Sequence, residues 1–177
     1  SSKSYGAWHQ GYFKRNKQIS SKSDHDGKAR ANIKFRVMNL SESKDFIVNS
    51  GSLKDVRLFS RDVFEKLNLD KNLKEELVLA IAEAAQNIVK HAYKGIEDTD
   101  DKMQIKISLN DNKLEIGFFD KGKPVVEENI QHRQLDDIKP GGLGTFFINQ
   151  IMDDVVFKKD QKKWVNHLVL TKNLSNN

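Results

Sequence analysis

The sequence contains no cysteine and only two prolines. Without cysteine there can be no disulfide, no thiolate zinc site and no cysteine nucleophile, and a reducing, cytoplasmic location fits best. Long apolar runs are also missing, because no stretch of about 18 apolar residues occurs and no apolar segment follows a charged start. A membrane span and a secretory signal are therefore not expected. A chain of 177 residues is long enough for one domain with a sizeable core.

The net charge of +5 is confined to the N-terminal end of the sequence. Residues 1–31 hold seven of the 30 Lys and Arg residues and two of the 25 Asp and Glu residues, so the rest of the chain is neutral overall. A basic segment can bind polyanions, but a neutral domain gives no reason to expect direct nucleic-acid binding. We expect residues 1–30 to be a basic, disordered leader, residues 31–173 one folded domain, and residues 174–177 a short tail.

Hydrophobic periodicity predicts strands and helices within residues 31–173. Apolar and polar residues alternate in the segments expected to be strands, which are 33–38, 45–49, 103–109, 114–118, 154–158 and 164–171. A polar turn is expected before the second of these strands, and residues 103–118 are expected to form a β-hairpin around Asn110-Asp111-Asn112.

Apolar residues at helical spacing predict three helices. These are 53–67 with Ser52 as its cap, 73–93 ended by Gly95, and 143–152. A polar connection of about twenty residues, 121–141, separates the hairpin from the last helix, and such a length is typical of a functional loop. The order of elements predicts an α/β fold, a two-layer sandwich with a mixed, mostly antiparallel sheet and helices on one face.

One candidate site lies in the second predicted helix. Glu83, Asn87 and His91 are spaced four residues apart, which places them on one stripe of the helix surface. Their neighbours, residues 79–82 and 84–85, form the most apolar stretch of the chain. A carboxylate and an amide are costly there unless they are paired or face a cleft. Spacing alone leaves open a solvent-facing stripe of an amphipathic helix.

A second candidate is the end of the predicted strand 114–118, where Asp120 and Gly122 follow two phenylalanines. An aspartate at a strand end can accept a hydrogen bond from a ligand amino group, and a glycine lets a flat ligand approach the backbone. An ordinary Asp-x-Gly turn would have the same sequence.

A third candidate is Pro140-Gly141-Gly142-Leu143-Gly144, directly before an apolar helix. Free N–H groups and the helix dipole favour an anion at a helix start. The segment differs from the G-x-x-x-x-G-K-[ST] phosphate loop. A flexible loop before a helix is the plain alternative.

Taken in order, E-x-x-x-N on a helix, D-x-G after a strand, a long loop and G-x-G at a helix start resemble the N, G1 and G2 boxes of the GHKL ATPase superfamily. Within it, the chain is most similar to the bacterial anti-sigma-factor serine kinases of stress-response and sporulation partner switches. The segments that carry the resemblance are EAAQNIVKHAY at 83–93, DKGKP at 120–124 and GGLGTFFINQIMD at 141–153. The resemblance extends from about residue 32 to residue 172.

This resemblance implies a fold of the Bergerat type that binds ATP with Mg²⁺. It also implies that Glu83 is the general base for the attacking hydroxyl and that Asn87 binds Mg²⁺ through its side-chain oxygen. Asp120 then binds the adenine amino group, and Gly122 makes room beside it.

In the same comparison, the segment that cradles the phosphates comprises Gly142, Leu143, Gly144 and Thr145. Residues 121–141 correspond to the ATP lid, from which Lys139 could reach the γ-phosphate. Two positions depart from the family pattern: Thr145 replaces the usual leucine, and His167 stands where an arginine often follows asparagine.

The implied function is that of a serine-protein kinase and anti-sigma factor, which phosphorylates a STAS-domain anti-sigma-factor antagonist and sequesters a sigma factor. The family also makes a homodimer an expected assembly. One alternative is a nucleotide-binding module that sequesters its partner without phosphotransfer, and the presence of both Glu83 and Asn87 argues against it. A sensor histidine kinase or a gyrase-like ATPase is not expected, because residues 1–30 cannot supply a dimerisation helix and the chain lacks the length of a transducer domain.

Overall fold

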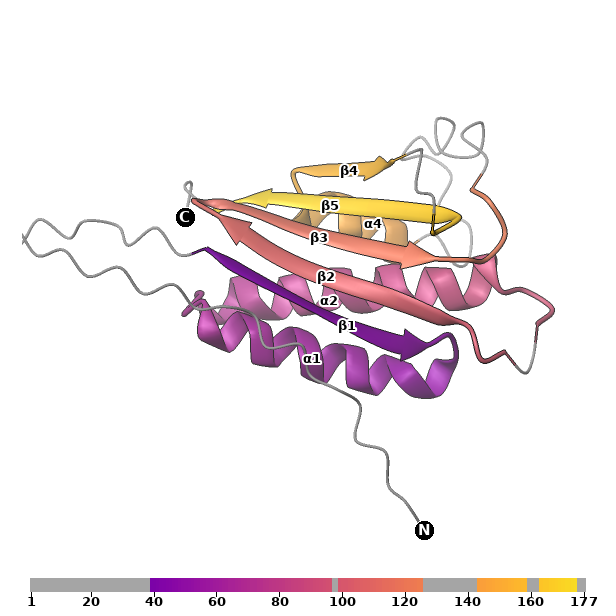
Figure 1. Cartoon of the computed structure of the whole chain (residues 1–177). Helices are drawn as coiled ribbons and strands as arrows, with labels where there is room; N and C mark the ends of the chain where they lie inside the picture. The colour runs from indigo at the N-terminus through magenta and orange to yellow at the C-terminus, as the bar shows by residue number, and fades with distance from the viewer. Residues whose placement is uncertain (1–38, 97–98, 126–142, 159–162, 175–177) are drawn as a thin grey trace, which may run out of the picture.

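The computed structural model describes residues 39–96, 99–125, 143–158 and 163–174. These residues form two layers, a sheet and a set of helices (Figure 1). All three labelled helices, α1, α2 and α4, lie on one side of the sheet, below or behind its strands in this view. The predicted two-layer α/β sandwich with helices on one face is confirmed.

In the part of the chain that the structure describes, the sheet has five strands in the order β1-β2-β3-β5-β4. All four pairs of neighbouring strands are antiparallel, so the sheet formed by the described residues is antiparallel throughout rather than mixed. The bounds of the strands are Leu40–Ile47 (β1), Lys102–Asn110 (β2), Lys113–Asp120 (β3), Asp154–Phe157 (β4) and Asn166–Asn173 (β5). The predicted hairpin, β2–β3, and the last two predicted strands are thereby confirmed to within two residues.

The first described strand differs from its prediction. β1 begins at Leu40, so the expected polar turn before residue 45 is wrong, and the expected strand 33–38 lies outside the described residues. β1 is an edge strand, and its inward-facing positions include the half-buried polar side chain of Glu42. Lys66 of α1 donates to Glu42 Oε1 at 2.6 Å. This pairing lets a polar residue occupy an inward position, so β1 lacks the regular alternation of apolar and polar residues that predicts a strand.

Among the described residues, the helix layer contains α1 (Leu53–Lys66), α2 (Lys71–Asn87) and α4 (Leu143–Ile151). The apolar positions expected for the second helix are buried, and fully so at Leu77 and Ile81. They pack against the inward face of the hairpin, where Ile105, Ile107 and Ile116 have no exposed surface. Each such side chain stabilises the fold by about 1.5–3 kcal/mol.

The start of α1 is capped by a different residue from the one predicted. Ser52 makes no side-chain capping hydrogen bond to α1. Instead, the Asn49 side chain accepts a hydrogen bond from the Ser52 backbone N–H at 2.9 Å and so caps a short 3₁₀ turn, Ser50–Ser52, that leads into the helix. The capping residue is therefore Asn49, three residues before the predicted Ser52.

The predicted helix 73–93 changes geometry near its end. Regular α-helix stops at Asn87, and Ile88–Ala92 form a π-helical turn, after which Gly95 adopts a φ of 82°. Turns of this kind are often found at functional sites. The wider turn ends the spacing of four, so His91, which is exposed, does not continue the stripe of Glu83 and Asn87.

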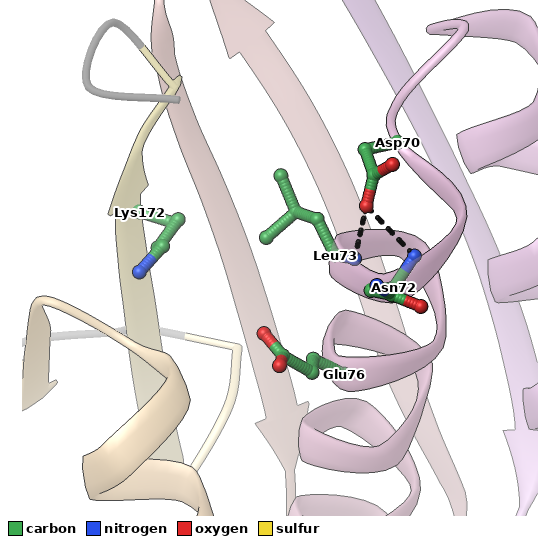
Figure 2. Close-up of a pocket in the computed structure, with 5 residues that line it drawn as sticks. All are labelled: Asp70, Asn72, Leu73, Glu76 and Lys172. Atoms are coloured by element: carbon green, nitrogen blue, oxygen red, sulfur yellow. Dashed lines mark hydrogen bonds between the residues drawn. The ribbon is translucent and has the colours of Figure 1, made fainter.

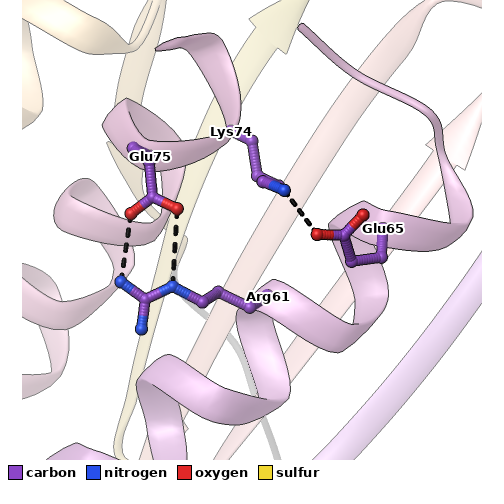
Figure 3. A network of polar contacts seen from close by, with 4 residues as sticks. All are labelled: Arg61, Glu65, Lys74 and Glu75. Carbon is purple, nitrogen blue, oxygen red and sulfur yellow. Dashed lines mark hydrogen bonds and ion pairs between the residues drawn. The ribbon is translucent and has the colours of Figure 1, made fainter. Parts of the chain in front are cut away.

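Two ion pairs join α1 to α2 on the outer surface of the helix layer (Figure 3). Arg61 contacts both oxygens of Glu75, at 3.5 Å through Nε and 3.0 Å through its terminal nitrogen, and Lys74 donates to Glu65. The side chains of Arg61 and Glu75 are nearly half exposed. Exposed pairs of this kind contribute little to the stability of a fold.

Candidate functional site

The second half of α2 carries the first two motif residues. Glu83 and Asn87 are both half-buried, and α2 packs against α4. A Cβ atom placed on Gly144, in the first turn of α4, would lie only 2.3 Å from Glu83 Oε2. The Glu83 carboxylate therefore fills the space where a residue-144 side chain would be. The fold brings the predicted N-box glutamate into contact with the predicted G2 glycine.

Of the predicted G2 segment, the structure describes the residues from Leu143 onward. Leu143 begins α4, Gly144 contacts Glu83, and Thr145 is half-buried one residue later. Gly142 and Lys139 lie outside the described residues. The predictions for those two residues, and for the loop beyond Val125, stay predictions.

Asp120 ends β3 with its side chain on the inward face of the sheet, 3% exposed. Within the described residues, the hydrogen bonds to its carboxylate both go to Oδ1, from the Gly122 N–H at 2.8 Å and from Asn166 Nδ2 at 2.9 Å. Burial raises the pKa of the Asp120 carboxyl, while these two hydrogen bonds oppose that rise. The carboxylate is thus a buried and oriented hydrogen-bond acceptor.

Gly122 has a packing reason to be glycine. A Cβ atom there would lie 2.6 Å from the Ala92 Cβ and 2.7 Å from the Ala92 carbonyl oxygen. Lys123 N–H donates to that same carbonyl at 2.9 Å, and Lys121 N–H donates to the Tyr93 hydroxyl at 3.3 Å. The segment after β3 therefore lies directly against the π-helical turn, which places Asp120 near the end of the helix that carries Asn87.

Asn166 is a site residue that none of the sequence motifs includes. Asn166 is 6% exposed, lies directly opposite Asp120 in the β3–β5 pairing, and donates to the Asp120 carboxylate. A signal was present, because Asn166 starts the inward series Asn166, Leu168, Leu170, in which the other two residues are apolar. A buried amide at a strand end needs hydrogen-bond partners, and its partner could have been sought at the end of the neighbouring strand.

A cavity of about 380 Å³ lies at the other end of α2. Its lining side chains are shown in Figure 2 and are Asp70, Asn72, Leu73, Glu76 and Lys172. Asp70 there caps α2 by accepting hydrogen bonds from the N–H groups of Asn72 and Leu73. Residues 70–76 are at the start of α2 and the motif residues are near its end, so this cavity is separate from the motif residues.

Metal ligands are sparse in the part of the chain that the structure describes. No group of three or more His, Asp or Glu residues is placed there to hold a cation. Mg²⁺ commonly binds to one or two protein oxygens together with waters and substrate phosphates, and the half-buried Asn87 amide beside Glu83 fits that mode. Among these same residues, no helix is both long enough and apolar enough to cross a bilayer.

Comparison with known protein sequences gives one family match and two relatives. The profile of the family described as histidine kinase-like ATPase domain matches residues 48–172. The serine-protein kinase RsbW of Halalkalibacterium halodurans is 31% identical over 113 residues, which cover 59% of this chain and 67% of that protein. The protein of the same name from Listeria monocytogenes is 35% identical over 103 residues, which cover 49% of this chain and 59% of that protein.

Among solved structures, this chain is similar to the RsbU and RsbW domains of Rv1364c from Mycobacterium tuberculosis. The TM-score is 0.55 at 15% sequence identity, and the match covers 76% of this chain and 32% of that one. At this level of identity, the likeness concerns the fold alone. It agrees with the antiparallel sheet and single helix layer described above.

Proposed function

Because the chain belongs to the histidine kinase-like ATPase domain family, we propose that it binds Mg·ATP and transfers the γ-phosphoryl group to a serine or threonine of a protein partner. The partner we propose is a STAS-domain anti-sigma-factor antagonist, with a sigma factor as the protein that the kinase sequesters. The relatives named serine-protein kinase support this activity. The observation that carries the proposal is the contact between Glu83 and Gly144, which joins a carboxylate to the start of a helix.

Each motif residue has a role in this proposal. Asp120, as a buried acceptor, binds the adenine amino group, and Gly122 keeps the adjoining backbone close to the end of α2. The N–H groups at the start of α4 face the phosphates, since a helix start favours anions. Gly142, Leu143, Gly144 and Thr145 contribute there, and Lys139 supplies a positive charge from the lid.

Glu83 is the general base of the proposed reaction. Its carboxylate accepts the proton of the substrate hydroxyl as the hydroxyl oxygen bonds to the γ-phosphorus, and the bond from that phosphorus to the bridging oxygen breaks to release ADP. Asn87 is the residue that would hold Mg²⁺ by its side-chain oxygen. When bound, Mg²⁺ neutralises charge on the phosphates.

The test of this proposal compares two variants. Glu83→Gln should keep Mg·ATP affinity close to that of the wild type but slow phosphotransfer by about 10²–10⁴-fold, the usual effect of losing a positioned base. Asp120→Asn should abolish measurable ATP binding while the thermal transition is retained, because the amide presents a donor where the adenine amino group needs an acceptor. Calorimetry with Mg·ATP and transfer of labelled γ-phosphate to STAS-domain proteins from the same organism provide the measurements.

Two outcomes would count against the proposal. Unchanged phosphotransfer in Glu83→Gln would remove Glu83 as the base. ATP binding and partner binding by the wild type, with no transfer to any STAS-domain protein, would favour the sequestering module over the kinase.

A further inference from the structure

One buried amide forms a junction between two strand ends and the segment that leaves β3. Asn166 Nδ2 donates both to Asp120 Oδ1 at 2.9 Å and to the Lys123 carbonyl at 3.0 Å. Asn166 Oδ1 accepts from the Val125 N–H at 3.0 Å. A single side chain at the start of β5 therefore holds Asp120 at the end of β3 and two backbone groups three and five residues further along.

The chemistry of these three contacts selects asparagine. The Val125 N–H requires an acceptor, and the Lys123 carbonyl and the Asp120 carboxylate each require a donor, so the orientation of the amide is determined by its partners. An aspartate has the same shape but no donor when ionised. A serine or threonine has a single donor, so it cannot serve both acceptors.

The contact also affects the charge of Asp120. Burial raises the pKa of the Asp120 carboxyl, and the hydrogen bond from Asn166 is the foremost of the effects that lower it. Asp120 is 3% exposed, so water cannot replace a lost donor at little cost. Removing Asn166 should leave a carboxylate that is less firmly oriented and easier to protonate.

We propose that Asn166 is a positioning residue for nucleotide recognition, which holds the Asp120 carboxylate as an acceptor and ties it to residues 123–125. The inference rests on the proposed function, in which Asp120 accepts the adenine amino group. It goes beyond that function because it gives a role to Asn166 through its hydrogen bonds to Asp120, Lys123 and Val125. It makes the preference for adenine over guanine depend on Asn166, because guanine presents a carbonyl acceptor where adenine presents its amino donor.

Asn166→Asp provides the sharpest test. This change keeps the side-chain shape and the acceptor for Val125, but it places a second carboxylate against Asp120. Two carboxylates at hydrogen-bond distance tend to share one proton. Mg·ATP affinity relative to wild type should fall by about tenfold or more at about pH 8, where the pair repels, and should recover towards about pH 6 as the pair takes up a proton.

Three further variants complete the experiment. Asn110→Asp makes the same substitution at the exposed far end of β2, and its affinity relative to wild type should stay constant with pH. Asn166→Ser keeps one hydroxyl donor and should bind Mg·ATP with an affinity between those of wild type and Asn166→Ala. Mg·ATP and Mg·GTP affinities are measured by calorimetry on the full chain at both pH values. The ratio of Mg·ATP affinity to Mg·GTP affinity should be smaller for Asn166→Ala than for wild type.

The outcomes separate this inference from the proposed function. If Asp120→Asn loses ATP binding while the Asn166 variants keep wild-type affinity, pH dependence and selectivity, the positioning role is wrong and the proposed function stands. If Asp120→Asn binds ATP like the wild type, the adenine role of Asp120 is wrong and the positioning role fails with it. If Asn166→Asp shows no thermal transition at the higher pH, the Asn166→Ser variant is used for the test instead. Wild-type Mg·ATP affinity in Asn166→Ser would refute the positioning role of Asn166.

Discussion

Replacing Gly144 by alanine should separate catalysis from folding. The added Cβ would lie 2.3 Å from Glu83 Oε2 and 3.3 Å from Glu83 Cδ, so the carboxylate would have to leave its place. The carboxylate is the far end of a flexible side chain on α2, and it can rotate away without moving either helix. We therefore expect the fold to be retained and the proposed base to be misplaced.

The magnitudes follow from this geometry. A changed or off-rotamer glutamate costs about 0.5–1.5 kcal/mol, and alanine gains up to about 1 kcal/mol over glycine as a helix former. These terms largely offset each other, so the free energy of unfolding should change by less than about 1 kcal/mol. A displacement of a reacting group by about 1 Å can cost about 10²-fold in rate, so phosphotransfer should fall by at least about that factor.

Two other glycines serve as controls. In Gly122→Ala the new Cβ would meet the Cβ and the carbonyl oxygen of Ala92 at 2.6 and 2.7 Å. Because these atoms cannot rotate away, we expect a loss of about 1–3 kcal/mol in unfolding free energy, the usual cost of overpacking. In Gly51→Ala the nearest atom is the side-chain oxygen of Asn49 at 3.3 Å, in an exposed turn, and both activity and stability should stay near wild type.

The assay combines urea unfolding with transfer of labelled γ-phosphate from ATP to a STAS-domain substrate. Wild-type transfer by Gly144→Ala would show that the place of the Glu83 carboxylate against α4 does not matter for the reaction. A loss of more than about 2 kcal/mol in unfolding free energy would show that the contact is rigid. Either result would refute the reasoning.

Two more predictions concern stability. His167 is stacked on Phe119 with ring centroids 4.0 Å apart, and its pKa is lowered by burial and then by the charge of Lys158, against a smaller opposite effect of Glu115. The unfolded chain therefore binds this proton at higher pH than the folded one, so the stability of the fold should decrease as pH drops below about 6.5. The His167→Phe variant should lose less stability over the same range. Equal changes in Tm for wild type and variant between about pH 7.5 and pH 5.5 would contradict this. Removing residues 1–30 should leave Mg·ATP affinity and Tm nearly unchanged, because every motif lies later in the chain, and a large loss of Tm would show that the segment stabilises the domain.

Local sequence patterns were sufficient for the helices, the hairpin and the layer arrangement. The strict alternation in 103–109 and 114–118 and the helical spacing of Leu77, Ile81 and Ile88 reflect burial of one face of each element, and the structure confirms these faces as buried. Such patterns are readable because each element makes its own half of the core. β1 lacked the pattern, since a polar residue at one of its inward positions pairs with α1.

The motif residues could be found by their spacing, but their contacts could not. The sequence predicts that Gly122 makes room for the adenine and that Gly144 belongs to the segment that cradles the phosphates. In the described structure each glycine also makes room for a neighbouring part of the protein, Ala92 and Glu83 respectively. These close approaches depend on how α2 packs against α4 and how the π-helical turn after α2 packs against the segment after β3. That packing is set by contacts between residues far apart in the chain.

The α/β sandwich, the buried faces and the order of the three motifs can be derived from local sequence patterns, because periodicity and motif spacing are properties of short segments. The hydrogen bond from Asn166 to Asp120 could not be derived in this way, because 46 residues separate the two in the chain and the folded sheet brings them together. Their meeting depends on the register between β3 and β5, which pairs Asp120 with Asn166. A shift of that register by one residue would turn the inward side chains to the other face of the sheet. The register is selected by burial along both strands together, so neither strand specifies it alone.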